Sequence, residues 1–184
     1  MKLLTAALLS LAALSTQAAP RAVDTARSDI SFSVKQMGVA VDGRFARFDA
    51  QVNFDPARPE TSSAALTVDI ASIDAGSEEA DSTAAERAWL DKAGFPKATF
   101  KSTSVRAVGP GKYEAKGLLT IKGKPREITV PFTAADQASG STLLSGKFSI
   151  RRTDFGIGGG EWNEGDLVAN EVPVKFQLLL APAK

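Results

Sequence analysis

Alternating apolar and polar residues dominate the chain and predict β-strands. Ile30, Phe32 and Val34 alternate with polar neighbours, and residues 48–54, 66–70, 113–121 and 128–132 show the same period of two, which is typical of strands with one buried face. Similar stretches at 98–105, 143–150 and 172–180 predict three more strands. The expected turns between strands are Asp42-Gly43, Asp55-Pro56, Gly109-Pro110-Gly111, Gly123-Lys124-Pro125 and Ser139-Gly140.

One stretch departs from this alternation and predicts a helix. Between Ser77 and Leu90 the chain is rich in glutamate and alanine, which favour helix, and Gly94 and Pro96 end it. Eight antiparallel strands with one helical insertion fit either a barrel or a sandwich. The barrel is favoured because it leaves no unpaired sheet edges. The predicted fold class is therefore all-β, an eight-stranded antiparallel barrel with a short helical insertion.

The first 18 residues have the pattern of an export signal. Lys2 precedes an apolar run from Leu3 to Leu14, and the small residues that a signal peptidase reads end at Ala18. The apolar run is too short to span a bilayer as a helix, which needs about 20 residues. We expect residues 1–18 to be a signal peptide and residues 19–184 to form one domain. The chain has no cysteine for a lipid anchor, so a periplasmic or secreted protein is predicted.

Composition narrows the chemistry further. The chain contains neither cysteine nor histidine, which excludes thiol chemistry and histidine-based catalysis. It has 22 basic and 21 acidic side chains, and loss of Lys2 with the signal balances the two signs. The charges form no long runs, so nothing favours binding to nucleic acid.

Six short motifs follow one another along the chain, at residues 30–34, 41–48, 89–96, 100–102, 117–123 and 152–157. Taken in order, they resemble those of the YceI-like family, which has lipocalin-like barrels implicated in binding polyisoprenoids and related long-chain lipids. The resemblance extends from about Val23 to Leu180. Where the family usually has a histidine near the end of the first strand, this chain has Gln36.

The resemblance implies an extended apolar tunnel inside the barrel. We expect the tunnel to be lined by residues at inward-facing positions of the strands. Its mouth is expected to be formed by the glycine-rich segment after residue 150. Small residues on the same faces leave room that aromatic rings can line, but periodicity alone equally fits a packed core. We predict a tunnel lined by Phe32, Phe48, Phe100, Leu119, Phe132 and Phe148, with Phe155 and Trp162 at its mouth and Arg152 as a head-group contact.

The segment from Arg152 to Asp166 admits several interpretations. Arg152 could contact a polar head group, or it could form a structural ion pair with Asp154, which we favour. The glycines at 156 and 158–160 do not open a helix after a parallel strand, as a dinucleotide fingerprint would. A loop that covers the tunnel mouth and a plain long turn are both consistent with them. Glu161, Glu164 and Asp166 match no EF-hand spacing, so a solvated acidic loop is favoured over a calcium site.

Three classes of function remain. The favoured one is a periplasmic protein that sequesters or carries a polyisoprenoid, isoprenoid quinone or fatty-acyl lipid, without cofactor or metal. By analogy with the family it could form a homodimer, and the sequence leaves open which membrane protein would receive the ligand. The second class is an envelope-stress interaction protein with a filled barrel. A lipid-acting hydrolase is less favoured because no Gly-x-Ser-x-Gly motif is present.

Overall fold

A computed structural model describes residues 21–162 and 167–182. The predicted signal peptide, residues 1–18, lies outside the described residues, as do Glu164 and Asp166 of the predicted acidic loop. No helix in the described part of the chain is both long enough and apolar enough to cross a membrane.

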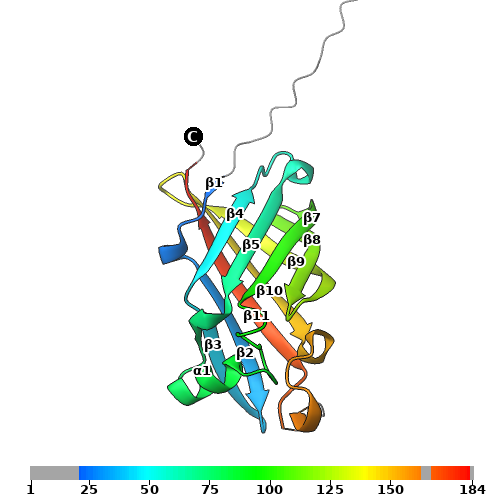
Figure 1. Ribbon diagram of the computed structural model, residues 1–184. Helices are drawn as coiled ribbons and strands as arrows, with labels where there is room; N and C mark the ends of the chain where they lie inside the picture. The colour runs from blue at the N-terminus through cyan, green and yellow to red at the C-terminus, as the bar shows by residue number, and fades with distance from the viewer. Residues whose placement is uncertain (1–20, 163–166, 183–184) are drawn as a thin grey trace, which may run out of the picture.

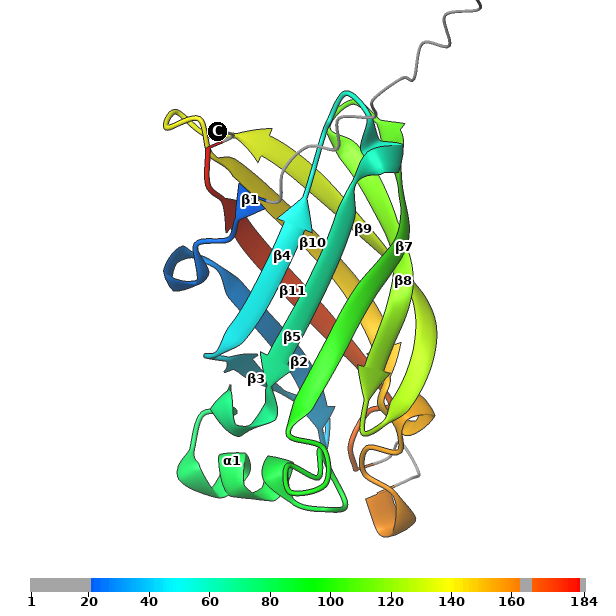
Figure 2. The ribbon, with the colours of Figure 1, turned by 45° about the horizontal axis from the view of Figure 1, so that its top comes forward.

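The described residues form one curled antiparallel sheet (Figures 1 and 2). Nine of its strands have six residues or more, and two strands have two residues each. Within residues 21–162 and 167–182, five short 3-10 helices (η) and a single α-helix connect them. The strands are β1 (Arg21–Ala22), β2 (Asp29–Gln36), β3 (Val39–Phe45), β4 (Phe48–Asn53), β5 (Ser63–Asp69), β6 (Ile73–Asp74), β7 (Lys97–Gly109), β8 (Lys112–Ile121), β9 (Lys124–Asp136), β10 (Thr142–Arg151) and β11 (Glu171–Leu180). The helices are α1 (Glu78–Ala85), η1 (Thr25–Arg27), η2 (Pro59–Thr61), η3 (Ile70–Ser72), η4 (Arg152–Phe155) and η5 (Gly160–Trp162).

The order of strands across the sheet is β1-β4-β5-β7-β8-β9-β10-β11-β2-β3-β6. The sheet curls so that the segment after β1 meets β11, where an isolated bridge joins Val23 to Leu180. Within the described residues no ladder joins β3 to β4, which follow each other along the chain. The predicted all-β antiparallel barrel is confirmed, although the ladder is not continuous around it.

The predicted number of strands was wrong, because β3 and the two-residue strands β1 and β6 were missed. Asp42-Gly43, interpreted as a turn, lies inside β3, with Gly43 paired to Phe32 of β2. The turn between β2 and β3 is Met37-Gly38, whose φ angles are 48° and 82°. Both residues are in the left-handed region that a two-residue hairpin turn of the primed type requires. The eight strands predicted from alternation all correspond to strands of the sheet.

The predicted helix is shorter than expected. Ser77 caps α1 by accepting a hydrogen bond from the Ala80 N–H at 3.2 Å, and acidic residues occupy the first turn, where the helix dipole favours them. The helix ends at Ala85, because Glu86 has an extended backbone conformation. Figure 2 shows α1 at the same end of the barrel as the segment that follows β10, opposite the end where the C-terminus lies.

Candidate functional site

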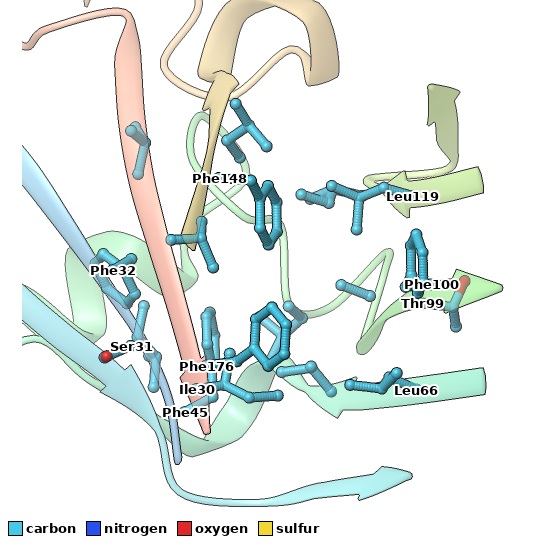
Figure 3. A pocket seen from close by; sticks show the side chains of 18 of the residues that line it. Ile30, Ser31, Phe32, Phe45, Leu66, Thr99, Phe100, Leu119, Phe148 and Phe176 are labelled. Atoms are coloured by element: carbon cyan, nitrogen blue, oxygen red, sulfur yellow. The ribbon is translucent and has the colours of Figure 1, made fainter. Parts of the chain in front are cut away.

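A cavity of about 590 Å³ lies inside the barrel. Its wall is mainly apolar and comes largely from alternate residues of β2 to β5 and β7 to β11, because such residues share the inner face of a strand. Figure 3 shows Phe32, Phe100, Leu119 and Phe148 reaching toward this space from four different strands. Glu79 and Arg152 are the only charged residues among the described residues that line it. The volume is within the range of small-molecule sites, about 300–1,000 Å³.

Three aromatic rings pack together beside the part of the cavity formed by the end of β4 and the start of β8. Phe54 meets Tyr113 edge to face with ring centroids 5.0 Å apart, and Tyr113 stacks on Phe132 at 5.4 Å. Phe54 and Phe132 line the cavity, whereas Tyr113 is buried behind them. This cluster belongs to the main hydrophobic core, so the interior is partly filled here and hollow elsewhere.

Two segments cover the other end of the cavity, and together we call them the cap. The first contains α1 and the turns that follow it, up to residue 95, and the second is the segment 152–162. Ala80 and Trp89 of the first segment and Ile157 of the second line the cavity. Ser77 and Glu79 also line it and are exposed, which indicates that the cavity reaches solvent beside the start of α1.

Arg152 holds the second cap segment in place. Its side chain is 1% exposed, and its guanidinium lies 6.0 Å from the centroid of the Trp89 ring. Burial lowers the pKa of Arg152, but a guanidinium stays protonated in proteins. All five of its N–H groups donate hydrogen bonds to backbone carbonyls. The acceptors are Ala169 at 3.2 Å, Ile157 at 2.9 Å, Gly158 at 2.8 Å, Val168 at 2.8 Å and Trp162.

This arrangement corrects the favoured interpretation of Arg152 and Asp154. The two side chains form no ion pair: Asp154 is exposed, and every Arg152 donor is bonded to a carbonyl. Arg152 still has a structural role, as expected, but its partners are backbone carbonyls and not the Asp154 carboxylate. A head group would find no free N–H on Arg152, so any effect of this residue on a ligand would act through its charge.

Two further contacts tie the cap segments together. The Gly158 N–H donates to the Ala88 carbonyl at 2.8 Å. Lys122, in the turn between β8 and β9, donates from Nζ to the carbonyls of Arg87 and Gly156, both at 2.9 Å. Burial lowers the pKa of Lys122, while the negative charge of Asp91 opposes this effect. The cap is therefore fastened by cations that bond to backbone oxygens and not to carboxylates.

The structure brings most, but not all, of the predicted site residues to the cavity. Six line it, and their role toward a ligand remains a prediction: Phe32, Phe100, Leu119, Phe132, Phe148 and Arg152. Three do not. Phe48 is buried in the hydrophobic core, Phe155 is buried at 2% exposure within η4, and Trp162 packs against Trp89 with ring centroids 5.8 Å apart.

Several lining residues were not predicted. Phe45, Leu66 and Phe176 line the cavity (Figure 3), and all three occupy alternating positions that could have identified them. Trp89, which was not predicted, also lines the cavity, whereas Trp162, which was expected at its mouth, does not. In the described residues no group of three or more acidic side chains could hold a metal ion.

Comparison with known proteins gives relatives that match most of the chain. A UPF0312 protein of Vibrio cholerae is 36% identical over 148 residues, which cover 76% of this chain and 78% of the relative. A UPF0312 protein of Shewanella oneidensis is 31% identical over 154 residues, or 79% of this chain and 81% of the relative.

Solved structures agree with the fold. The crystal structure of Burkholderia cenocepacia BcnA is 42% identical, covers 86% of this chain and 99% of its own, and has a TM-score of 0.83. A polyisoprenoid binding domain from Saccharophagus degradans is 16% identical, covers 90% of this chain and 99% of its own, and superimposes with a TM-score of 0.68, which shows similarity of fold. The family model of the YceI-like domain matches residues 22–180, and the chain belongs to this family.

Proposed function

We propose that this protein binds a long apolar ligand inside its barrel and carries or stores it in the periplasm. The candidate ligands are a polyisoprenoid, an isoprenoid quinone or a fatty-acyl lipid. The observation that carries the proposal is the 590 Å³ apolar cavity. An eight-stranded barrel can instead have an interior packed with side chains. The alternative function, an envelope-stress interaction protein, requires such a packed interior. The described residues leave the space open.

The size of the cavity supports a chain of moderate length. If a methylene group needs about the 30 Å³ that a water molecule takes in the liquid, the 590 Å³ cavity holds about 20 carbon atoms. At about 0.8 kcal/mol for each buried methylene, the gross burial free energy is on the order of 15 kcal/mol. Ordering a flexible chain and immobilising the two partners offset much of this. The remainder is consistent with a ligand that survives purification.

The family supports a binding role. The domain from Saccharophagus degradans is described as polyisoprenoid binding, and its barrel has the same fold as this one. Among the described residues the lining contains two charged side chains, and the donors of one of them, Arg152, are fully used. Recognition would therefore depend on the shape and apolar character of the chain more than on its head group.

Native mass spectrometry of protein released from the periplasm without detergent tests the proposal. A stoichiometric added mass, identified after organic extraction as an isoprenoid, quinone or acyl lipid, is the expected result. The delipidated protein should rebind the same compound. Protein that is isolated empty and also refuses polyprenyl and acyl lipids would overturn the proposal. Recovery of the protein in the cytoplasmic fraction would overturn its periplasmic part.

A further inference from the structure

Three phenylalanines of the cavity wall each lie against a glycine of the neighbouring strand. A methyl group added at Gly43 would lie under 3.0 Å from three atoms of the Phe32 ring. At Gly117 the added group would be 2.7 Å from two atoms of the Phe100 ring, and at Gly146 it would be under 3.0 Å from the Phe176 ring. Each ring therefore occupies the space that a side chain on the neighbouring strand would fill.

These contacts keep the rings flat against the wall. Phe32 and Gly43 are directly opposite each other in the β2–β3 ladder, so their side-chain directions point to the same face, which is the cavity. A residue with a side chain at position 43 would push the Phe32 ring away from β3 by about 1 Å to restore normal contact. The Phe45 ring, with its centroid 5.6 Å from that of Phe32, restricts movement along the wall. The ring would therefore move into the lumen.

Gly43 differs from the other two glycines in what surrounds it. An added methyl group at Gly117 would also lie 2.5 Å from the Lys101 carbonyl oxygen, and one at Gly146 would lie 2.7 Å from the Pro131 carbonyl oxygen. Those atoms belong to the backbone and cannot yield without distorting the sheet. At Gly43 the three nearest atoms all belong to the far end of the Phe32 side chain. Gly43 is not among the residues with positive φ, so its backbone accepts alanine.

We propose that Gly43 is a specificity-determining residue that sets the width of the cavity for methyl-branched, polyprenyl-type chains. This inference rests on the proposed function and refines it. A polyprenyl chain carries a methyl branch on every repeating unit and is wider than a straight acyl chain. The lumen beside Phe32 accepts that width because glycine lets the ring lie against β3. Alanine at position 43 would narrow the lumen and select straight chains.

The experiment compares two alcohols with the same head group and main-chain length, branched geranylgeraniol and straight hexadecanol. The delipidated full mature chain is titrated with each, and the dissociation constants are measured by quenching of tryptophan fluorescence. We expect Gly43→Ala to weaken geranylgeraniol binding about tenfold or more, as one methylene does in an apolar pocket, and to change hexadecanol binding less than about threefold. Gly109→Ala is the matched control, because Gly109 also lies in a strand, does not line the cavity, and an added methyl group there would come no closer than 4.0 Å to its nearest neighbour, Lys112.

The double variant Gly43→Ala/Phe32→Leu tests whether the ring transmits the effect. With the ring removed, the added methyl group has nothing to displace, so the ratio of the two affinities should match that of the single variant Phe32→Leu. A double variant that keeps the full loss of selectivity would overturn the proposal, since the change would then act through the strand. Equally weakened binding of both alcohols, or an unchanged ratio of the two affinities in a folded Gly43→Ala protein, would overturn it as well.

The wild-type protein separates this inference from the proposed function. If the wild type binds neither alcohol, the proposed function fails together with this inference. If it binds both, the variants test the inference alone.

Discussion

Replacing Arg152 by methionine is expected to release the second cap segment. Methionine has nearly the length of the arginine stem but no donor, so five backbone carbonyls would lose a hydrogen bond. Two of these bonds, to Gly158 and Val168, are buried. Each buried acceptor without a partner costs about 1–3 kcal/mol. The two together predict a loss of about 2–6 kcal/mol, and the other three carbonyls lie closer to water.

This loss is large compared with the total stability of a domain, about 5–15 kcal/mol. It has an upper limit, because the segment can open locally and expose its carbonyls to water without unfolding the strands. We therefore expect the free energy of unfolding to fall toward the lower end of the range. The Ile157 and Gly158 amides, which bond to the Arg152 and Ala88 carbonyls, should become fast to exchange.

Urea unfolding followed by tryptophan fluorescence, together with hydrogen exchange measured by mass spectrometry, tests this prediction. Arg151→Met is the matched control: Arg151 precedes Arg152, is exposed, and has no hydrogen bond from its side chain in the described structure. Exchange in β7 to β9 should be similar in both variants. If Arg152→Met were as stable as Arg151→Met, with slow exchange at residues 157 and 158, the five bonds would not be what holds the cap.

Three further predictions concern the cavity, the sheet and the surface. Leu119→Trp should fill part of the lumen and abolish binding of polyprenyl alcohol in a folded protein, as measured by titration; unchanged affinity would remove Leu119 from the site. Gly146→Ala should lower stability by about 1–3 kcal/mol by overpacking, and thermal unfolding would show it, whereas an unchanged midpoint would contradict the close approach of the Phe176 ring. The hydrogen bond from Arg47 lowers the pKa of Asp69, so its stabilising effect is present above about pH 4 and is lost as the pH falls through the lowered value. Arg47→Ala should weaken the acid dependence of the unfolding midpoint, and identical pH profiles would refute this.

The sequence predicts the class of the fold well because alternation is a local property. A strand with one buried face shows its period of two within a few residues, and the eight strands predicted in this way are present. The cap was harder to predict. The path of the segment 152–162 depends on hydrogen bonds from Arg152 to carbonyls as far away as Val168 and Ala169, and no local pattern encodes these bonds.

Alternation also predicts which face a residue occupies, but not what lies on that face. Phe48 and Phe100 both have the pattern of inward positions, yet Phe48 is part of the packed core whereas Phe100 lines the cavity. Phe48 pairs with Val68, whereas Phe100 pairs with Leu66 and Leu119, and alternation within one strand does not encode these pairings. Phe155 is not on a strand at all, since it ends η4. A period of two therefore carries no information about it.

The wrong position of the first hairpin turn explains why β3 was not predicted, and also why the contact between Phe32 and Gly43 was not. In a two-residue hairpin the turn fixes the register, so residues at equal distances from Met37-Gly38 face each other. Phe32 lies five positions before Met37 and Gly43 five positions after Gly38, which makes them a pair. Because Asp42-Gly43 was interpreted as the turn, neither β3 nor the position of Gly43 opposite the Phe32 ring was predicted. With the turn placed correctly, a ring opposite a glycine would have been predictable here, because a glycine leaves the space in which a neighbouring ring can lie against the wall. The pairing of Gly146 with Phe176 joins β10 to β11 across a long connection, and no short turn sets its register.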